Sequence, residues 1–261
     1  MQGGMDHEDF AGNKGTLHTG DLQFMTAGRG IVHAEMPHVH EDGSRNVGFQ
    51  LWVDLPQHLK SCEPRYRDLR AAEIPKVDVD EGRVTVKVIS GQSHGIDSVK
   101  DLAYTPVWIL DVEVRPGGKI VQPLPRGWNG FAYVLEGKAL IGEGEQGKEV
   151  EEYNITVLEP DGDVVHIAVD SSVTKPALLR KSLYNPAPHI FSVNPVSLTS
   201  SHHSIVLIAG PPLDQPVIQY GPFVVSSKED IYQAMFDYQT HTNGFERAKD
   251  WKSGIAQARV R

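Results

Sequence analysis

The sequence predicts an all-β protein of two domains with a short helical segment near its C-terminal end. Short runs rich in β-branched and aromatic residues recur along the 261-residue chain, and Gly, Pro, Asn and Asp separate most of them, as in a sandwich or barrel. The chain is long enough for two domains of ordinary size. The predicted strands are Gln50–Val53, Val84–Ile89, Val107–Val114, Phe131–Leu135, Ile155–Leu158, Val164–Val169 and Ile205–Ile208.

A further strand is predicted at the end of the run from Gly20 to Pro37, and it carries His33 and Glu35. Alternate residues of a strand share a face, so these two side chains are expected to point into one cavity. Gly28 and Gly30 precede them, as in a tight turn that leads into the strand. Imidazole and carboxylate suit non-haem iron among other metals, although two ligands alone hold a metal poorly. His33 and Glu35 are therefore candidate metal ligands.

Helical structure is predicted mainly near the C-terminal end. The polar segment from Pro56 to Pro75 reads as a connection with a short helical turn. Ser226–Glu229 forms a capping box that opens a helix, and Asn243-Gly244 is expected to close it. A second short helix is predicted around Phe245–Lys252. The apolar stripe of the first helix, which predicts packing on a barrel, is Ile231, Met235 and Tyr238.

Composition argues against several classes of protein. The net charge is −9 and no Lys/Arg cluster is present, so direct nucleic-acid binding is not expected. No apolar run approaches membrane-spanning length, and the N-terminus has no apolar signal core. Cys62 is the only cysteine, which excludes an intrachain disulfide and fits a reducing compartment. The expected location is the cytoplasm, the nucleus or both.

The chain resembles the pirin family, whose members are built from two tandem cupin (double-stranded β-helix) barrels. The resemblance spans nearly the whole chain. The segments that carry it are His7–Phe10, Gly20–Pro37, Gly48–Val53, Val88–Gly91, Leu207–Gly210, Gln219–Val224 and Asn243–Lys249. It implies an N-terminal cupin domain over residues 1–102 and a C-terminal cupin domain over 103–225. A helical tail is then expected over 226–261.

The resemblance also implies a site and a function. Pirins bind iron (Fe) in the N-terminal barrel through three histidines and a glutamate, and His33 and Glu35 match the later pair. The earlier His-x-His pair has no counterpart here, so this barrel is expected to be incomplete and the chain to begin just past those ligands. Some pirins oxidise flavonols such as quercetin with dioxygen, where Glu35 is the candidate catalytic base. Pirins also act as nuclear co-regulators that contact transcription factors.

Three readings of the function therefore stay open: a quercetin 2,3-dioxygenase-like iron enzyme acting on a flavonol-like small molecule, a non-catalytic protein-binding module, and an inactive truncated product. With His33 and Glu35 alone, weak iron binding and little dioxygenase activity are expected. His38 and His40 form another His-x-His pair close to Glu35, but they belong to a polar loop and are expected to be solvated. His7 is expected either to make structural hydrogen bonds or to position a metal ligand or a water molecule through a hydrogen bond.

The second domain keeps the spacing of a cupin metal motif without its ligands. From Gly117 the ligand positions fall on Pro123, Pro125 and Gly130, and Val165 stands where the last histidine would be. The adjacent His166 is expected to face the other side of its strand. Metal binding in the cupin manner is therefore not expected in this domain.

Two further segments call for interpretation. Gly91–Gly95 matches the Gly-x-Ser-x-Gly pattern of hydrolases, but the residues after it make a poor helix, so we expect a loop rather than a nucleophile elbow. Residues from about 176 to 202 do not fit the family pattern. They are either a tolerated surface insertion or translated non-coding sequence.

Overall fold

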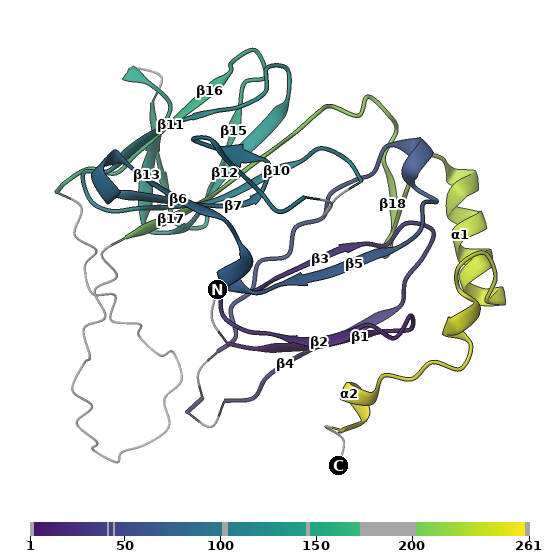
Figure 1. Ribbon diagram of the computed structural model, residues 1–261. Coiled ribbons are helices and arrows are strands. Elements are labelled where there is room, and N and C mark those ends of the chain that lie inside the picture. The colour runs from purple at the N-terminus through teal and green to yellow at the C-terminus, as the bar shows by residue number, and fades with distance from the viewer. Residues whose placement is uncertain are drawn as a thin grey trace, which may run out of the picture. The chain divides into compact units, whose positions relative to one another are not determined.

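The computed structural model describes residues 3–40, 42–43, 45–100, 104–144, 147–172 and 202–258 (Figure 1). They belong to two compact units. Unit 1 comprises residues 1–74, 99–106 and 212–261, and unit 2 comprises residues 75–98 and 107–211. Strands dominate both units, which confirms the all-β prediction. The unusual segment at about 176–202 lies outside the described residues except for its last position.

Unit 1 contains three small antiparallel sheets and the C-terminal helices. One sheet has the order β2-β1-β4, a second pairs β3 with β5, and a third pairs β18 with β19. In Figure 1, β3 and β5 lie over the sheet formed by β1, β2 and β4. The elements are β1 (Met5–Asp9), β2 (Lys14–Leu17), β3 (Leu22–Thr26), β4 (His33–Pro37), η1 (Gln57–Leu59), β5 (Arg65–Leu69), η2 (Ala71–Glu73), β18 (Ile218–Tyr220), β19 (Phe223–Val225), α1 (Lys228–Thr240), η5 (Glu246–Ala248) and α2 (Gly254–Ala258).

Unit 2 contains a six-stranded sheet of order β15-β12-β17-β10-β7-β6 and a four-stranded sheet of order β11-β16-β13-β14. A short hairpin of β8 and β9 follows β7. The elements are β6 (Lys76–Val79), η3 (Asp80–Gly82), β7 (Val84–Ser90), β8 (Gln92–Ser93), β9 (Ile96–Asp97), β10 (Trp108–Val114), β11 (Lys119–Pro123), β12 (Asn129–Glu136), β13 (Lys138–Ile141), β14 (Lys148–Glu151), β15 (Ile155–Leu158), β16 (Val164–Ala168) and β17 (His203–Gly210).

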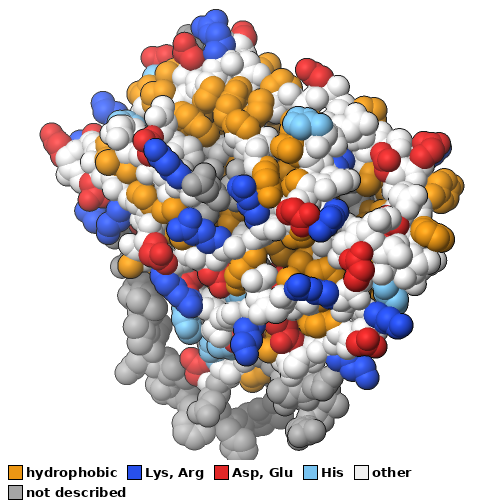
Figure 2. All heavy atoms as spheres, turned by 45° about the vertical axis from the view of Figure 1, so that its right-hand side comes forward, with side chains coloured by type: hydrophobic (Ala, Val, Ile, Leu, Met, Phe, Trp, Pro, Cys, Tyr) orange, Lys and Arg blue, Asp and Glu red, His pale blue; other side chains and the backbone are white. Residues whose placement is uncertain are grey.

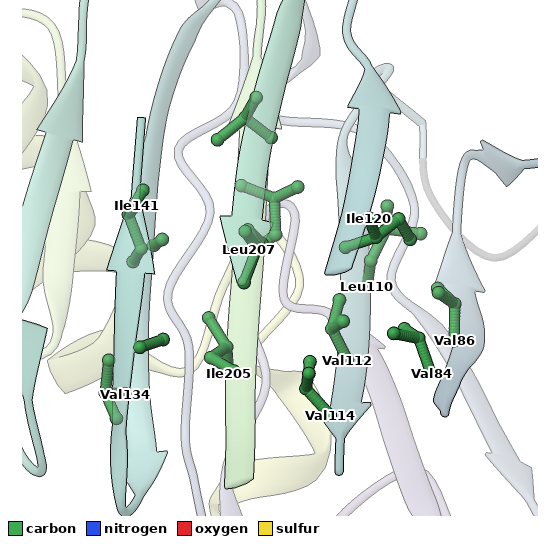
Figure 3. Close-up of a cluster of buried hydrophobic side chains, with 14 of the residues drawn as sticks. Val84, Val86, Leu110, Val112, Val114, Ile120, Val134, Ile141, Ile205 and Leu207 are labelled. Atoms are coloured by element: carbon green, nitrogen blue, oxygen red, sulfur yellow. The ribbon is translucent and has the colours of Figure 1, made fainter. Parts of the chain in front are cut away.

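The core of unit 2 is aliphatic and follows the alternation of its strands. Along β7, Val84, Val86 and Val88 are fully buried, whereas the residues between them are not. From Leu110 onward, every second residue of β10 is buried in the same way. Figure 3 shows side chains from β7, β10, β12, β13 and β17 gathered in one cluster. Two sheets that each present an apolar face to a shared core give this unit its stability.

Two strand predictions are wrong. Residues 50–53 form no regular strand, because no neighbouring strand pairs with them in the described residues, and Trp52 stays 58% exposed. The segment from Pro56 to Pro75 is more than a connection with a helical turn, because it also contains β5. The inward-facing polar residues of β5 hide it from a hydrophobic pattern. The other predicted strands are present with small shifts at their ends.

The predicted C-terminal helix begins where expected but ends earlier. The Ser227 side chain accepts a hydrogen bond from the Asp230 N–H at 3.1 Å and caps the start of α1. The helix ends at His241, which takes a left-handed conformation two residues before Asn243. Residues 245–252 contain only the single turn η5, and α2 begins at Gly254. No helix among the described residues is long and apolar enough to cross a membrane.

Charged side chains of both signs are interspersed on the face of the molecule shown in Figure 2, and hydrophobic side chains gather in patches between them. Several large hydrophobic residues are exposed in each unit. Among those with more than half of their surface exposed are Ile155 and Val157 in unit 2 and Trp52, Tyr232 and Phe236 in unit 1. Exposed apolar groups of this size are candidates for interaction surfaces.

Candidate metal centre and its polar surroundings

β1 and β4 bring two histidines and two carboxylates to one face of the three-stranded sheet in unit 1. In this antiparallel ladder His7 lies opposite Glu35, and Asp9 lies opposite His33. Cross-strand partners point to the same side, as do alternate residues of one strand, so all four side chains share a face. The shared face that the sequence predicts for His33 and Glu35 is present in β4.

The candidate ligands themselves lie close together. His33 Nε2 is 3.9 Å from Glu35 Oε1, and the two side chains are 36% and 32% exposed. Two ligand atoms that each bind one metal ion at about 2.0–2.2 Å can lie up to about 4.4 Å apart. The separation is therefore compatible with a shared ion, and the partial exposure leaves room for one.

A small hollow adjoins this face. His33 borders it, whereas Glu35 does not contribute to its lining. The lining residues are His7, Glu8, Asp9, Gln23, Met25, His33 and Tyr66. Strands β1 and β4 supply one side of the hollow, and β3 and β5 of the second sheet supply the rest. The hollow is thus lined mostly by polar groups, several of which are hydrogen-bonded to one another.

His7, Tyr66 and Asp68 form a hydrogen-bonded network next to the hollow. The Tyr66 hydroxyl donates to Asp68 Oδ2 at 2.7 Å, and the His7 ring lies 3.1 Å from the same oxygen. The Tyr66 hydroxyl also lies within hydrogen-bond distance of the His7 ring. His7 is only 3% exposed. Of the two roles expected for His7, the structural hydrogen bonds are observed.

The protonation of Tyr66 is fixed by its surroundings. Burial, together with the hydrogen bond to Asp68 and the charge of that carboxylate, raises the pKa of Tyr66 well above its usual value of about 10. The phenol therefore remains a neutral donor throughout the physiological pH range. Sequence reasoning missed Tyr66 and Asp68, although the alternation of Arg65 and Arg67 outward with these two inward was a usable strand signal.

The loop histidines after β4 have partners of their own. His38 Nε2 lies 2.8 Å from Asp6 Oδ1, and His40 Nε2 lies 2.9 Å from Asn46 Oδ1. Both are therefore more ordered than the solvated histidines that the sequence predicts. These partners occupy one ring nitrogen of each histidine. They hold the His38 ring against β1 and the His40 ring within its own loop.

The residues present do not complete a metal site. In the described ranges, no group of three or more His, Cys, Asp and Glu side chains is arranged to hold a metal ion. Of the polar residues opposite His33 and Glu35, His7 is engaged in the network of Tyr66, and both carboxylate oxygens of Asp9 accept hydrogen bonds from Asn13. Among the described residues, His33 and Glu35 thus remain a pair of candidate ligands without a third beside them.

The positions singled out in unit 2 make structural contacts of three kinds: core packing, an ion pair and a buried hydrogen bond. Val165 is 4% exposed and faces the core, whereas His166 faces outward with its Nε2 3.5 Å from Glu143 Oε2. Ser93 is 1% exposed and its hydroxyl donates to Gln122 Oε1 at 2.7 Å. The short strand β9 follows Ser93 in place of the helix that a nucleophile elbow requires, as expected.

Comparisons with known proteins agree with the resemblance seen in the sequence. Residues 1–53 match the family described as Pirin, and residues 109–179 and 191–244 match the Pirin C-terminal cupin domain. Pirin of Homo sapiens is 44% identical over 253 residues, which cover 97% of this chain and 75% of that protein. Pirin-like protein 2 of Arabidopsis thaliana is 38% identical over 259 residues, which cover 97% of this chain and 69% of that protein.

Solved structures match the fold. Quercetin 2,3-dioxygenase from Acinetobacter baumannii superimposes with a TM-score of 0.71 at 25% sequence identity, covering 92% of this chain and 72% of that chain. The protein GK1651 from Geobacillus kaustophilus superimposes with a TM-score of 0.61 at 29% sequence identity, covering 83% of this chain and 73% of that chain. These similarities confirm the predicted all-β cupin fold with its short C-terminal helical segment.

Proposed function

Because the chain belongs to the pirin family, we propose that it is a pirin-type cupin in which His33 and Glu35 supply two ligands of a metal site. The observation that supports this proposal is the 3.9 Å separation of His33 Nε2 and Glu35 Oε1 on one face of β4. Iron is the metal that the family resemblance implies, and imidazole with carboxylate suits it.

We further propose that metal binding by the 261-residue chain is weak. The described residues bring no third ligand to His33 and Glu35, and two protein ligands leave most of the coordination shell to water. Flavonol oxidation of the quercetin dioxygenase type, with Glu35 accepting a proton from the flavonol hydroxyl, is then expected to be slow. A solved relative carries the name of that activity.

A second candidate function is that of a non-catalytic binding module. The incomplete ligand set favours it, because a protein-binding role does not need open metal positions. In this proposal the chain acts in the nucleus or cytoplasm through protein partners such as transcription factors. Metal content distinguishes the two candidates, since only the first depends on a loaded site.

The test is iron analysis of the purified chain by mass spectrometry, combined with an anaerobic iron(II) titration and an assay of quercetin consumption. We expect well below one iron per chain, little turnover, and loss of the remaining affinity in His33→Ala and in Glu35→Ala. His166→Ala is the matched control, because His166 also lies beside a glutamate, Glu143, but on unit 2.

Two results would contradict the proposal in different ways. Iron retained at about one per chain and lost in His33→Ala would confirm the location of the site but refute the weak binding. Residual affinity that is unchanged in both His33→Ala and Glu35→Ala would refute the location itself.

A further inference from the structure

Unit 2 presents four sheet edges in the part of the chain that the structure describes. β15 and β6 flank the six-stranded sheet, and β11 and β14 flank the four-stranded sheet. An uncovered edge exposes unpaired backbone N–H and C=O groups, which another strand can bind. Proteins usually block such edges with charged side chains, proline or bulges.

Three of the four edges are blocked in this way. β6 exposes Lys76 and Asp78, and β14 exposes charged residues at three of its four positions. β11 ends in Pro123, and its Lys119 N–H is already bonded to Asp80 Oδ2 at 2.9 Å. Addition of another strand to these edges is therefore disfavoured by charge, or on β11 by the small number of outward donors.

β15 differs from the other edges. Its four residues include no charge and no proline, and Ile155 and Val157 are 55% and 77% exposed. Thr156 and Leu158 point inward, where Leu158 packs against the core. The strand thus presents two large β-branched side chains to solvent, and residues of this type favour strand pairing.

The backbone of β15 also has groups available for a new partner. Just before β15, Tyr153 and Asn154 both lie opposite Val134 of β12, as in a β-bulge. The Val134 C=O accepts a hydrogen bond from the Tyr153 N–H at 2.7 Å, and the Val134 N–H donates to the Asn154 C=O at 3.0 Å. Antiparallel hydrogen bonding alternates, so the next residue of β15 bonded to β12 is Thr156, opposite Ala132. The N–H and C=O groups of Ile155 and Val157 therefore point away from β12.

Acidic side chains surround this edge. β14 and β15 line a groove of about 830 Å³, part of which is open to solvent. Residues 148–159 include four glutamates and one lysine. Lys138 forms an ion pair of 2.7 Å with Glu149. Glu151, the last residue of β14, and Glu159, the residue after β15, are both exposed. The local charge therefore favours a basic occupant.

We propose that β15 is a docking edge for an extended protein segment in which apolar residues alternate with lysine or arginine. The outward N–H and C=O groups of Ile155 and Val157 bind the backbone of that segment. Its apolar side chains pack on Ile155 and Val157, and the negative charge of Glu151 and Glu159 attracts its basic side chains. This proposal is independent of the metal site, because it involves only unit 2.

The test uses a labelled hexapeptide of alternating lysine and valine, blocked at both ends, and fluorescence anisotropy with the full 261-residue chain. Val157→Pro removes an outward N–H without breaking a bond to β12, and we expect about tenfold weaker binding. Val121→Pro is the matched control. Val121 is an exposed valine on β11, and by the same alternation its N–H points away from β16. This control should bind the peptide as the unmodified chain does.

Two further variants test the proposal if proline disturbs the strand. Val157→Lys keeps the backbone but adds a charge that repels the probe, so it should also weaken binding. Combining Glu151→Gln with Glu159→Gln should lower the affinity and flatten its dependence on salt. A peptide of alternating glutamate and valine should bind much more weakly than the lysine peptide.

Three outcomes would overturn the proposal. Equal affinity of the lysine peptide for the unmodified chain and for Val157→Pro would show that β15 is not the docking edge. Equal affinity for the lysine and glutamate peptides would refute the basic occupant. Sedimentation showing a dimer that Val157→Pro dissociates would assign the edge to a second copy of the chain.

Discussion

His7 lies directly opposite Glu35 in the ladder of β1 and β4, and its ring is hydrogen-bonded from behind by Asp68 and Tyr66 of β5. A candidate metal ligand and a buried polar network thus meet across one pair of strands. The network joins the sheet of β1, β2 and β4 to the pair of β3 and β5. Polar contacts of β5 with His7 on β1 thus link β5 to the strand that pairs with β4.

Replacement of Tyr66 by phenylalanine tests the energetic importance of this network. The change removes the hydroxyl that donates to Asp68 Oδ2, and the other oxygen of that carboxylate, Oδ1, is already buried without a partner among the described residues. Loss of one donor to a carboxylate should lower the free energy of unfolding by about 1–3 kcal/mol. Urea denaturation monitored by circular dichroism measures the change.

Tyr220→Phe is the control for the same chemical change, because Tyr220 is 58% exposed on β18. We expect its stability to remain within about 0.5 kcal/mol of the unmodified chain. If the two variants unfold at the same urea concentration, the network of Tyr66 contributes nothing measurable.

The contrast between β4 and β5 shows how far the sequence predicts this site. His33 and Glu35 could be placed on one face because the turn glycines before them and the period of two are local signals. Tyr66 and Asp68 could not be placed, because an aspartate at an inward position looks like a loop until its partner His7 is known. β5 is a strand because it pairs with the distant β3, and the side-chain contacts of Tyr66 and Asp68 with His7 span 59 and 61 positions of the sequence.

The predicted strand at residues 50–53 failed for the related reason that strand propensity needs a partner. Trp52 and Val53 have the composition of a strand, yet both remain exposed. The aliphatic strands of unit 2 were predicted with small errors, because a run such as Val84–Ile89, in which every second residue is buried, carries its own signal. Local patterns thus predict the core of the fold better than its polar site.

Gly30 is the second position at which a substitution should be costly. Its φ is +147°, and an added Cβ would collide with the ring of Phe245, which is 4% exposed. Gly30→Ala should therefore lower the free energy of unfolding by about 2–4 kcal/mol through backbone strain and overpacking. It should also make the segment after Phe245 more susceptible to limited proteolysis.

Gly12→Ala separates the two causes. Gly12 also has a positive φ, of +98°, but a Cβ there would meet no atom within 4 Å. The loss in free energy of unfolding caused by Gly12→Ala should reflect backbone strain alone and be about half that of Gly30→Ala or less. Equal losses in the two variants would show that the contact with Phe245 is not important.

Asp80 should make the stability of unit 2 depend on pH in the acid range. Its carboxylate accepts hydrogen bonds from Arg83 Nε at 3.0 Å, Arg83 Nη2 at 2.9 Å and the Lys119 N–H at 2.9 Å. The Arg83 hydrogen bonds, followed by that of Lys119, lower the pKa of Asp80 from 3.8 to about 2. Since the folded pKa lies below the unfolded one, the stabilisation is present above about pH 4 and is lost as the pH falls towards 2.

The variant Asp80→Asn reveals this contribution, because asparagine tolerates the left-handed backbone at this position, where φ is +53°. We expect it to unfold more readily than the unmodified chain at pH 7 and the difference to shrink progressively between about pH 4 and pH 2. Asp97→Asn, at an exposed position on β9, should match the unmodified chain at every pH. If the difference in free energy of unfolding between Asp80→Asn and the unmodified chain stays constant across this pH range, the ionised carboxylate of Asp80 is not its cause. Only the titration of that carboxylate would make the two stability curves converge at low pH.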